Sequence, residues 1–148
     1  MVMSTQSWSE VRAREIIAHC AQLEGAALPM LHGLQHEFGY VPPGAVPIVA
    51  EALNLSRAEV HGIVSFYHDF RSEPAQKPVV KLCKAEACQA RGSTALGTQV
   101  LDQYGDAVQF EPTFCLGLCA SGPAAMVDGV PYARLTPERL NEILEAVT

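Results

Sequence analysis

Four of the five cysteines in this chain form two pairs in its second half, and this pattern constrains the fold more than any other feature. Cys83 and Cys88 are separated by four residues, Cys115 and Cys119 by three, and 26 residues lie between the pairs. Each pair lies where a predicted strand ends and a loop begins, so two loops at one end of a sheet can bring four thiolates together. Four thiolates at one point are typical of a soft metal centre.

Three chemistries compete for this arrangement. A structural zinc site usually has pairs on tight knuckles with two intervening residues, whereas the spacings here are longer and unequal. Two disulfides need an oxidising compartment. A two-iron cluster is bound by four cysteine thiolates and is wide enough for one pair on each iron. The spacing of the pairs and a reducing compartment favour the iron–sulfur cluster. Two alternatives stay open: structural zinc, and disulfides or spectator thiols.

The residues beside the cysteines fit a negatively charged cluster. Gly117 and Gly122 permit close backbone approach and positive φ, so that main-chain N–H groups can point at sulfur. Such hydrogen bonds stabilise the more negative reduced state. Lys81, Lys84 and Arg91 lie near the first pair in sequence and could compensate its charge; the alternative is that they are solvated surface cations.

The first half of the chain has helical periodicity. Ser9 or Ser7 can cap a helix that extends to about Leu23, whose apolar stripe is Val11, Ile16, Ile17, Cys20 and Leu23. Cys20, the unpaired cysteine, is therefore predicted to be a core residue. Further helices are predicted over about 28–38 and 45–53, and a fourth opens with the capping box Ser56 to Glu59. These helices form a predicted small bundle.

The periodicity changes after the proline-containing segment 71–78, which is predicted to be a linker. Strands are predicted at about 78–83 and 108–114, a helix at 93–104, a hairpin turning at Asp128-Gly129 with Pro131 on an edge strand, and a final helix at 137–147. The expected fold class is α+β, with a helical domain at 1–73 and a mixed-sheet α/β domain at 74–148.

Composition and charge exclude several kinds of protein. Ten Lys and Arg against sixteen Asp and Glu give a net charge of -6, the wrong sign for a protein that neutralises nucleic-acid phosphates. The stretch 1–10 is polar and lacks a signal-peptide pattern, and no run of 18 apolar residues predicts a membrane-inserted helix. A cytoplasmic location, with no nucleic-acid partner and no membrane insertion, is expected.

With both pairs and their flanks described, the chain resembles the thioredoxin-like [2Fe-2S] ferredoxins, the small flavoprotein-associated subunit of NADH dehydrogenases and their relatives. The stretches 28–42 and 55–67 look like the N-terminal domain of that family. The cysteine pattern matches the four cluster ligands of the family at Cys83, Cys88, Cys115 and Cys119. The resemblance implies one [2Fe-2S] cluster on these cysteines and a thioredoxin-like sheet domain.

Within the family, the stretch 83–89 looks most like the gamma subunit of NAD-dependent, molybdenum-containing formate dehydrogenases. This resemblance implies an electron-transfer subunit beside a beta subunit with FMN and NAD, with molybdopterin on an alpha subunit that oxidises formate. The equivalent subunit of an NADH:quinone oxidoreductase or NAD-reducing hydrogenase is the alternative, and a structural zinc-binding assembly module is the alternative from a different class.

No catalytic residue is predicted in this chain. It has no glycine-rich dinucleotide or phosphate-binding fingerprint and no arrangement typical of a nucleophile, so the catalytic activity is expected to belong to partner subunits. His32 and His36 are four residues apart and can share a helix face, but no metal-binding motif accompanies them.

Overall fold

A computed structural model describes residues 7–148, and these residues divide into two compact units, 7–75 and 76–148. Each unit has its own core of buried side chains. The first six residues of the polar stretch 1–10 lie outside the described part of the chain.

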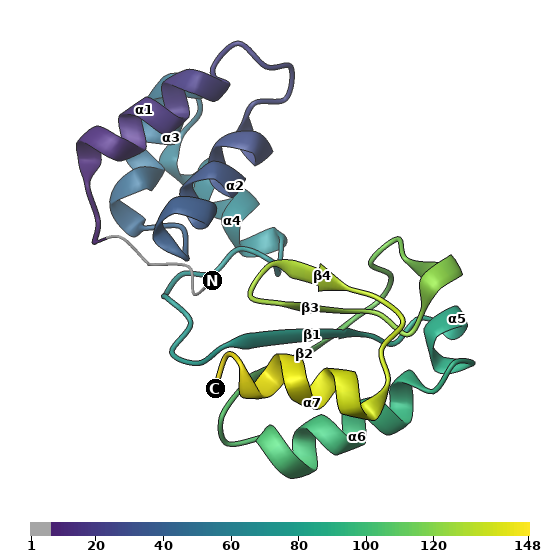
Figure 1. Ribbon diagram of the computed structural model, residues 1–148. Helices are drawn as coiled ribbons and strands as arrows, with labels where there is room; N and C mark the ends of the chain where they lie inside the picture. Colours follow the sequence, from purple (N-terminus) through teal and green to yellow (C-terminus); the bar gives the residue numbers. More distant parts are fainter. Residues whose placement is uncertain (1–6) are drawn as a thin grey trace. The chain divides into compact units, whose positions relative to one another are not determined.

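The first unit is helical (Figure 1). Its elements are α1 (Glu10–Cys20), α2 (Ala27–Phe38), the short 3-10 helix η1 (Pro43–Ala45), α3 (Val46–Leu53) and α4 (Arg57–Phe66). The helix α2 contributes four of the largest side chains of the core, namely Met30, Leu31, Leu34 and Phe38. Their spacing follows the helical period, which confirms the periodicity on which the prediction rested.

The predicted helix ends of the first unit are confirmed where a cap defines them. The Ser9 hydroxyl accepts a hydrogen bond from the Arg12 N–H at the start of α1. Ser56 and Glu59 form both halves of the capping box of α4. The predicted apolar stripe of α1 is partly wrong, because Val11 is 70% exposed and α1 ends before Leu23.

The reason for this difference is the direction in which α1 faces. Ala13 and Ile17, four residues apart, point into the core, and Val11 is two residues from Ala13, about 200° around the helix. Cys20 is only half-buried, and it packs against the edge of this core. It is therefore a packing residue, as predicted, but at the periphery.

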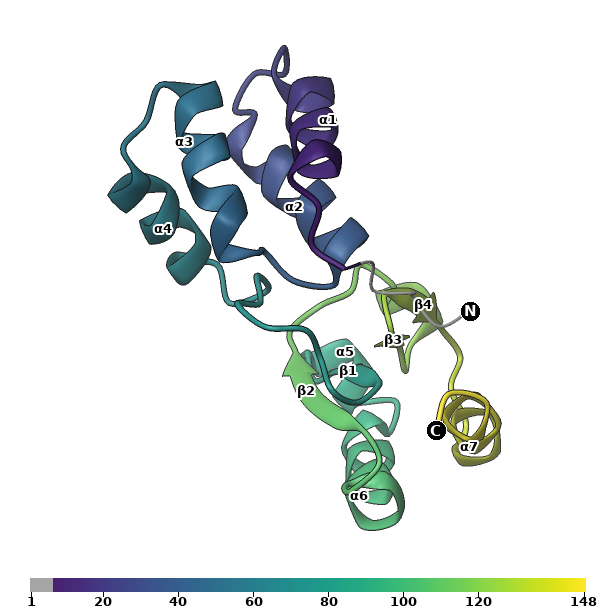
Figure 2. The same cartoon turned by 90° about the vertical axis from the view of Figure 1, so that its left-hand side faces the viewer.

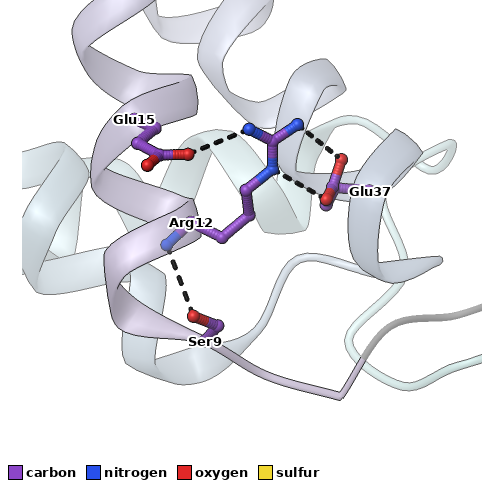
Figure 3. A network of polar contacts seen from close by, with 4 residues as sticks. All are labelled: Ser9, Arg12, Glu15 and Glu37. Atoms are coloured by element: carbon purple, nitrogen blue, oxygen red, sulfur yellow. Dashed lines mark hydrogen bonds and ion pairs between the residues drawn. The ribbon is translucent and has the colours of Figure 1, made fainter.

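Helices α1 and α2 pack closely. A Cβ added at Gly33 would lie 2.7 Å from Ile16 Cγ2, so only glycine allows this approach. Across the same contact, Arg12 Nε donates a 2.8 Å hydrogen bond to Glu37 Oε1, and Arg12 Nη1 bonds Glu15 at 2.9 Å (Figure 3). The ion pair joins two helices through residues that are 25 positions apart in the sequence.

The second unit is built on a mixed sheet. Its elements are β1 (Val79–Cys83), α5 (Glu86–Gln89), α6 (Ser93–Tyr104), β2 (Gln109–Thr113), the 3-10 helix η2 (Cys119–Ser121), β3 (Ala125–Val127), β4 (Val130–Tyr132) and α7 (Pro137–Glu145). The strand order is β2-β1-β3-β4. Strand β1 is parallel to β2 and antiparallel to β3, so the predicted mixed sheet is confirmed.

The helices α6 and α7 lie on the same side of this sheet (Figure 2). Their inward side chains meet alternate residues of β1, so that Leu96 and Leu140 share one core with Val80 and Leu82. The other side chains of β1, including Cys83, belong to the opposite face because side chains alternate along a strand. This alternation separates the core of the unit from its cysteines.

The hairpin prediction is also confirmed. Asp128 and Gly129 have φ values of 47° and 80°, as a two-residue turn between antiparallel strands requires. Pro131 lies in β4, the edge strand, where a missing N–H is tolerated. The short helix α5 was not predicted, since four residues between two loops carry no measurable period. Over residues 7–148, none of the helices combines the length and the apolar character that crossing a bilayer requires.

Candidate metal centre

The first cysteine pair lies at the end of β1. Cys83 is the last residue of that strand, and Cys88 is in the short helix α5 that follows. Both side chains are 1% exposed. The Cys83 N–H donates to the Ala124 carbonyl at 3.0 Å, and the Lys84 N–H donates to the Thr113 carbonyl at 2.7 Å. These bonds hold the start of the first cysteine loop, which carries Cys88, between the segments of β2 and β3.

The second pair follows β2, the parallel neighbour of β1. Cys115 has a φ of 90°, which turns the chain sharply after the strand, and Cys119 begins η2. Cys115 Sγ and Cys119 Sγ are 3.7 Å apart, and the Gly117 N–H points at Cys115 Sγ at 3.4 Å. Gly117 has the predicted positive φ, 75°. Both cysteines of this pair are exposed, in contrast to the first pair.

The electrostatics of the thiols show that the two loops meet. Burial raises the pKa of Cys83, but hydrogen bonds from the backbone at Ala85, from the Cys88 thiol and from the backbone at Cys115 and Leu116 leave this pKa below its ordinary value. Burial raises the pKa of Cys88, and its contact with Cys83 adds to the shift. Backbone of the second loop therefore faces sulfur of the first loop.

The second pair shows a similar mutual influence. A hydrogen bond with Cys115 raises the pKa of Cys119, and the charges of Cys115 and Cys83 act in the same direction. Thiols that lie this close disfavour simultaneous ionisation unless a cation is present. A soft metal cation removes this conflict, because thiolate is its preferred ligand.

The donor set fits a two-iron cluster. Two thiolates on one tetrahedral metal are about 3.8 Å apart when the metal–sulfur bond is about 2.3 Å, and the Cys115–Cys119 pair has 3.7 Å. The hydrogen-bonded thiol contacts are within the pairs, Cys83 with Cys88 and Cys115 with Cys119. Within residues 7–148, no three His, Cys, Asp or Glu side chains, these four cysteines included, lie close enough together to hold a metal ion, so the fit rests on each pair by itself. A [2Fe-2S] cluster takes one pair on each iron.

Gly122 lies where the two loops approach each other. A Cβ added there would lie 3.1 Å from Cys88 Sγ and 3.5 Å from Arg91 Cδ. The predicted close approach is therefore present, but the predicted positive φ is wrong, since Gly122 has a φ of -64°. Glycine fits this position because it has no side chain to contact the sulfur of Cys88, and not because of its conformational freedom.

The three cations predicted near the first pair have different partners. Lys81 pairs with Glu111 at 3.7 Å across the β1–β2 ladder. The Lys84 ammonium lies 5.8 Å from the centre of the Phe110 ring. Arg91 donates from Nη1 to the Ala120 carbonyl at 2.9 Å and to the Gly122 carbonyl at 3.4 Å. Arg91 therefore reaches across to the second cysteine loop.

The other candidate residues of the sequence lie outside this site. Cys20 belongs to the helical unit and packs on its core. The centres of the His32 and Phe70 rings are 4.9 Å apart and the rings are tilted by 57°, and His36 is exposed near the end of α2. Sequence reasoning missed the positive φ of Cys115 and the different burial of the two pairs. The short spacing of Cys115 and Cys119, which requires a turn facing sulfur, was the available signal for the positive φ of Cys115. No local pattern indicated that the two pairs differ in burial.

The fold and the site together define a protein in which two loops carrying four cysteines meet at the end of a mixed sheet. The family described as thioredoxin-like [2Fe-2S] ferredoxin matches residues 13–148, and the chain belongs to this family. Its fold is therefore a helical part followed by a thioredoxin-like α/β domain, as predicted, and the family binds one [2Fe-2S] cluster.

Relatives of the chain are subunits of larger complexes. The chain is 30% identical over 136 residues to the E subunit of the NADH-quinone oxidoreductase of Escherichia coli K12, covering 86% of this chain and 82% of that protein. It is 29% identical over 147 residues to the corresponding oxidoreductase subunit of Mycobacterium bovis, covering 93% of this chain and 58% of that protein.

A solved structure has a similar arrangement. An NAD+-reducing [NiFe]-hydrogenase in its H2-reduced state matches with 25% identity and a TM-score of 0.66. The match covers 79% of this chain and 22% of the hydrogenase chain, so the similar part is one segment of a longer polypeptide. This chain is an electron-transfer protein of the type found in NADH dehydrogenases and NAD-reducing hydrogenases.

Proposed function

We propose that this chain is the electron-transfer subunit of an NAD-dependent formate dehydrogenase, with one [2Fe-2S] cluster on Cys83, Cys88, Cys115 and Cys119. The observation that carries the ligand set is the meeting of the two loops. The Cys115 and Cys119 sulfurs are 3.7 Å apart, and backbone of their loop faces Cys83 Sγ. One pair then serves each iron.

The two cysteine pairs differ in burial, so one side of the site faces the sheet and the other faces solvent. Cys83 and Cys88 are 1% exposed, whereas Cys115 and Cys119 are exposed beside Phe114, whose side chain is 74% exposed. We expect the second pair to lie on the side that meets the partner. The first pair anchors the group in the sheet and excludes water from its other side.

When bound, the cluster supplies a one-electron site beside the two-electron chemistry of a flavin. The residues of this chain fix its position and tune its potential. The Gly117 N–H at 3.4 Å from Cys115 Sγ stabilises added negative charge on that sulfur. Leu116 and Leu118 pack against Cys83 and Cys88 and limit the access of water to them.

The choice of complex rests on the stretch 83–89, which looks most like the gamma subunit of formate dehydrogenases. On this proposal a beta subunit carries FMN and NAD, and a molybdopterin-containing alpha subunit oxidises formate. The similarity to the E. coli NADH-quinone oxidoreductase and to the hydrogenase supports the second candidate, a subunit of an NADH:quinone oxidoreductase or NAD-reducing hydrogenase.

Anaerobic purification of the chain tests the ligand set. We expect a brown protein with iron and acid-labile sulfide in equal amounts, which bleaches with dithionite and becomes paramagnetic. Cys115→Ser should lose or destabilise the cluster, and Cys20→Ser is the matched control that should leave the spectrum unchanged. A colourless preparation that contains zinc and lacks sulfide would refute the cluster.

Purification of the native complex tests the partner. Formate-dependent NAD reduction, with molybdenum and FMN in the same complex, is the expected result. Nickel in the complex, or NADH-dependent quinone reduction without molybdenum, would instead identify one of the alternative complexes.

A further inference from the structure

We propose that Arg91 is a positioning residue for the metal centre, which clasps the two cysteine loops together and raises the reduction potential through its charge. The inference rests on the ligand set proposed above. Arg91 comes from the segment after α5, and its guanidinium reaches the loop of Cys119. Its role is distinct from ligation, since arginine supplies no sulfur.

The clasp is formed by hydrogen bonds at both ends of Arg91. Its N–H donates to the Cys88 carbonyl at 3.1 Å, which ties it to the first pair. Its Nη1 donates to the carbonyls of Ala120 and Gly122, on the other loop. Both acceptors lie within three residues of Cys119 in the sequence. Through its backbone N–H and its side chain together, this one residue joins the loops that must approach for four sulfurs to meet.

The stem of Arg91 and the sulfur of Cys88 both lie next to Gly122. The space that a Gly122 Cβ would occupy is bounded by Cys88 Sγ at 3.1 Å and by Arg91 Cδ at 3.5 Å. The arginine stem therefore passes beside the sulfur of a proposed ligand. A lysine stem can follow this path, but a single ammonium does not reproduce the planar donor geometry of a guanidinium.

The charge of Arg91 acts on the same site. Within the described residues, no carboxylate is paired with Arg91, whereas Arg12 and Arg14 each pair with glutamates. A cation near an iron–sulfur cluster favours the more negative reduced state, and charge and hydrogen bonding are the main determinants of its potential. In a chain with a net charge of -6, this cation opposes the negative field of the other charged groups at the site.

Two variants of the full chain separate the clasp from the charge. Arg91→Gln should lower the midpoint potential in an equilibrium redox titration and release iron to a chelator about fivefold faster. Arg91→Lys keeps the charge, so its potential should stay near that of the wild type while iron release is still accelerated. Arg139→Gln, on the exposed face of α7, removes the same charge without a bond to either cysteine loop and should change neither quantity.

The outcomes distinguish this inference from the proposed function. If the wild-type chain holds the cluster, and Arg91→Gln has the wild-type midpoint potential and the wild-type half-life of iron release to the chelator, the role of Arg91 is refuted and the proposed function stands. A wild-type chain without iron and sulfide overturns both proposals. If Arg91→Gln does not fold, Arg91→Lys tests the clasp instead. Iron release at the wild-type rate in Arg91→Lys would refute the clasp, and faster release at an unchanged midpoint potential would support it.

Discussion

Gly122→Ala is the most discriminating change at the metal centre, because it adds one methyl group beside one sulfur. The new Cβ would lie 3.1 Å from Cys88 Sγ. Ordinary van der Waals contact begins at 3.4 Å, so the sulfur or the loop must move by about 0.3 Å. Metal–ligand distances are tolerated within about 0.2 Å, so the displacement is large enough to disturb ligation.

The effect on the fold itself should be small. Gly122 has φ -64° and ψ 165°, an extended conformation that alanine adopts readily. Backbone conformation alone would let alanine stabilise the chain by about 0.4–1 kcal/mol by restricting the unfolded state, and the 3.1 Å contact with Cys88 Sγ opposes this gain. The cluster-free variant should therefore melt close to the cluster-free wild type. Changes in groups that orient metal ligands typically reduce metal affinity by about 10- to 100-fold.

The assay compares cluster loading and thermal unfolding of the same preparations. Iron and acid-labile sulfide are measured after anaerobic reconstitution, and iron release to a chelator gives the half-life of the cluster. Gly62→Ala in α4 is the control, since nothing lies within 4 Å of the added Cβ. We expect Gly122→Ala to lose iron about tenfold faster and Gly62→Ala to behave as the wild type.

Either of two results would refute this reasoning. One is a Gly122→Ala protein with the wild-type iron content and chelator half-life, which would show that Cys88 Sγ does not need the space. The other is a large fall in the melting temperature of the cluster-free variant, which would show that the methyl group disturbs the fold rather than the ligand.

Three further predictions concern the rest of the chain. Gly33→Ala should lower the free energy of unfolding by about 1 kcal/mol in urea titrations, because its Cβ meets Ile16 Cγ2 at 2.7 Å; an unchanged or raised stability would contradict the close α1–α2 contact. A hydrogen bond from Arg12 lowers the pKa of Glu37 in the folded state. The pair therefore stabilises the fold fully above the unfolded-state pKa of about 4.3, and this stabilisation is lost as the pH falls through the lower folded-state pKa. The melting temperatures of wild type and Glu37→Gln should accordingly converge between about pH 7 and pH 3, and a constant difference would refute the linkage. Finally, a protease of broad specificity should cut first in the exposed segment 72–77, which tests the predicted domains 1–73 and 74–148; first cleavage elsewhere would contradict that boundary.

Local chemistry explains why so much of the fold was predictable. The capping box of Ser56 and Glu59, the glycine after α2 and the Asp128-Gly129 turn each act over a few residues, so the sequence defines them without knowledge of the rest. The order of strands and helices in the second half likewise favoured a mixed sheet. Where the pattern was only periodic, as in α1, the exposed Val11 shows that periodicity does not choose the inward face.

The sequence by itself determined the grouping of four cysteines, the proposed ligands, in two pairs at the ends of two strands, because cysteine spacing and strand periodicity are properties of the linear chain. Tertiary structure decided that Cys83 and Cys88 are buried while Cys115 and Cys119 are exposed. It also decided that Gly122 makes room for sulfur and that Arg91 reaches the second loop. Burial and contact across 29 or more residues depend on how the sheet brings its loops together, which no local pattern encodes.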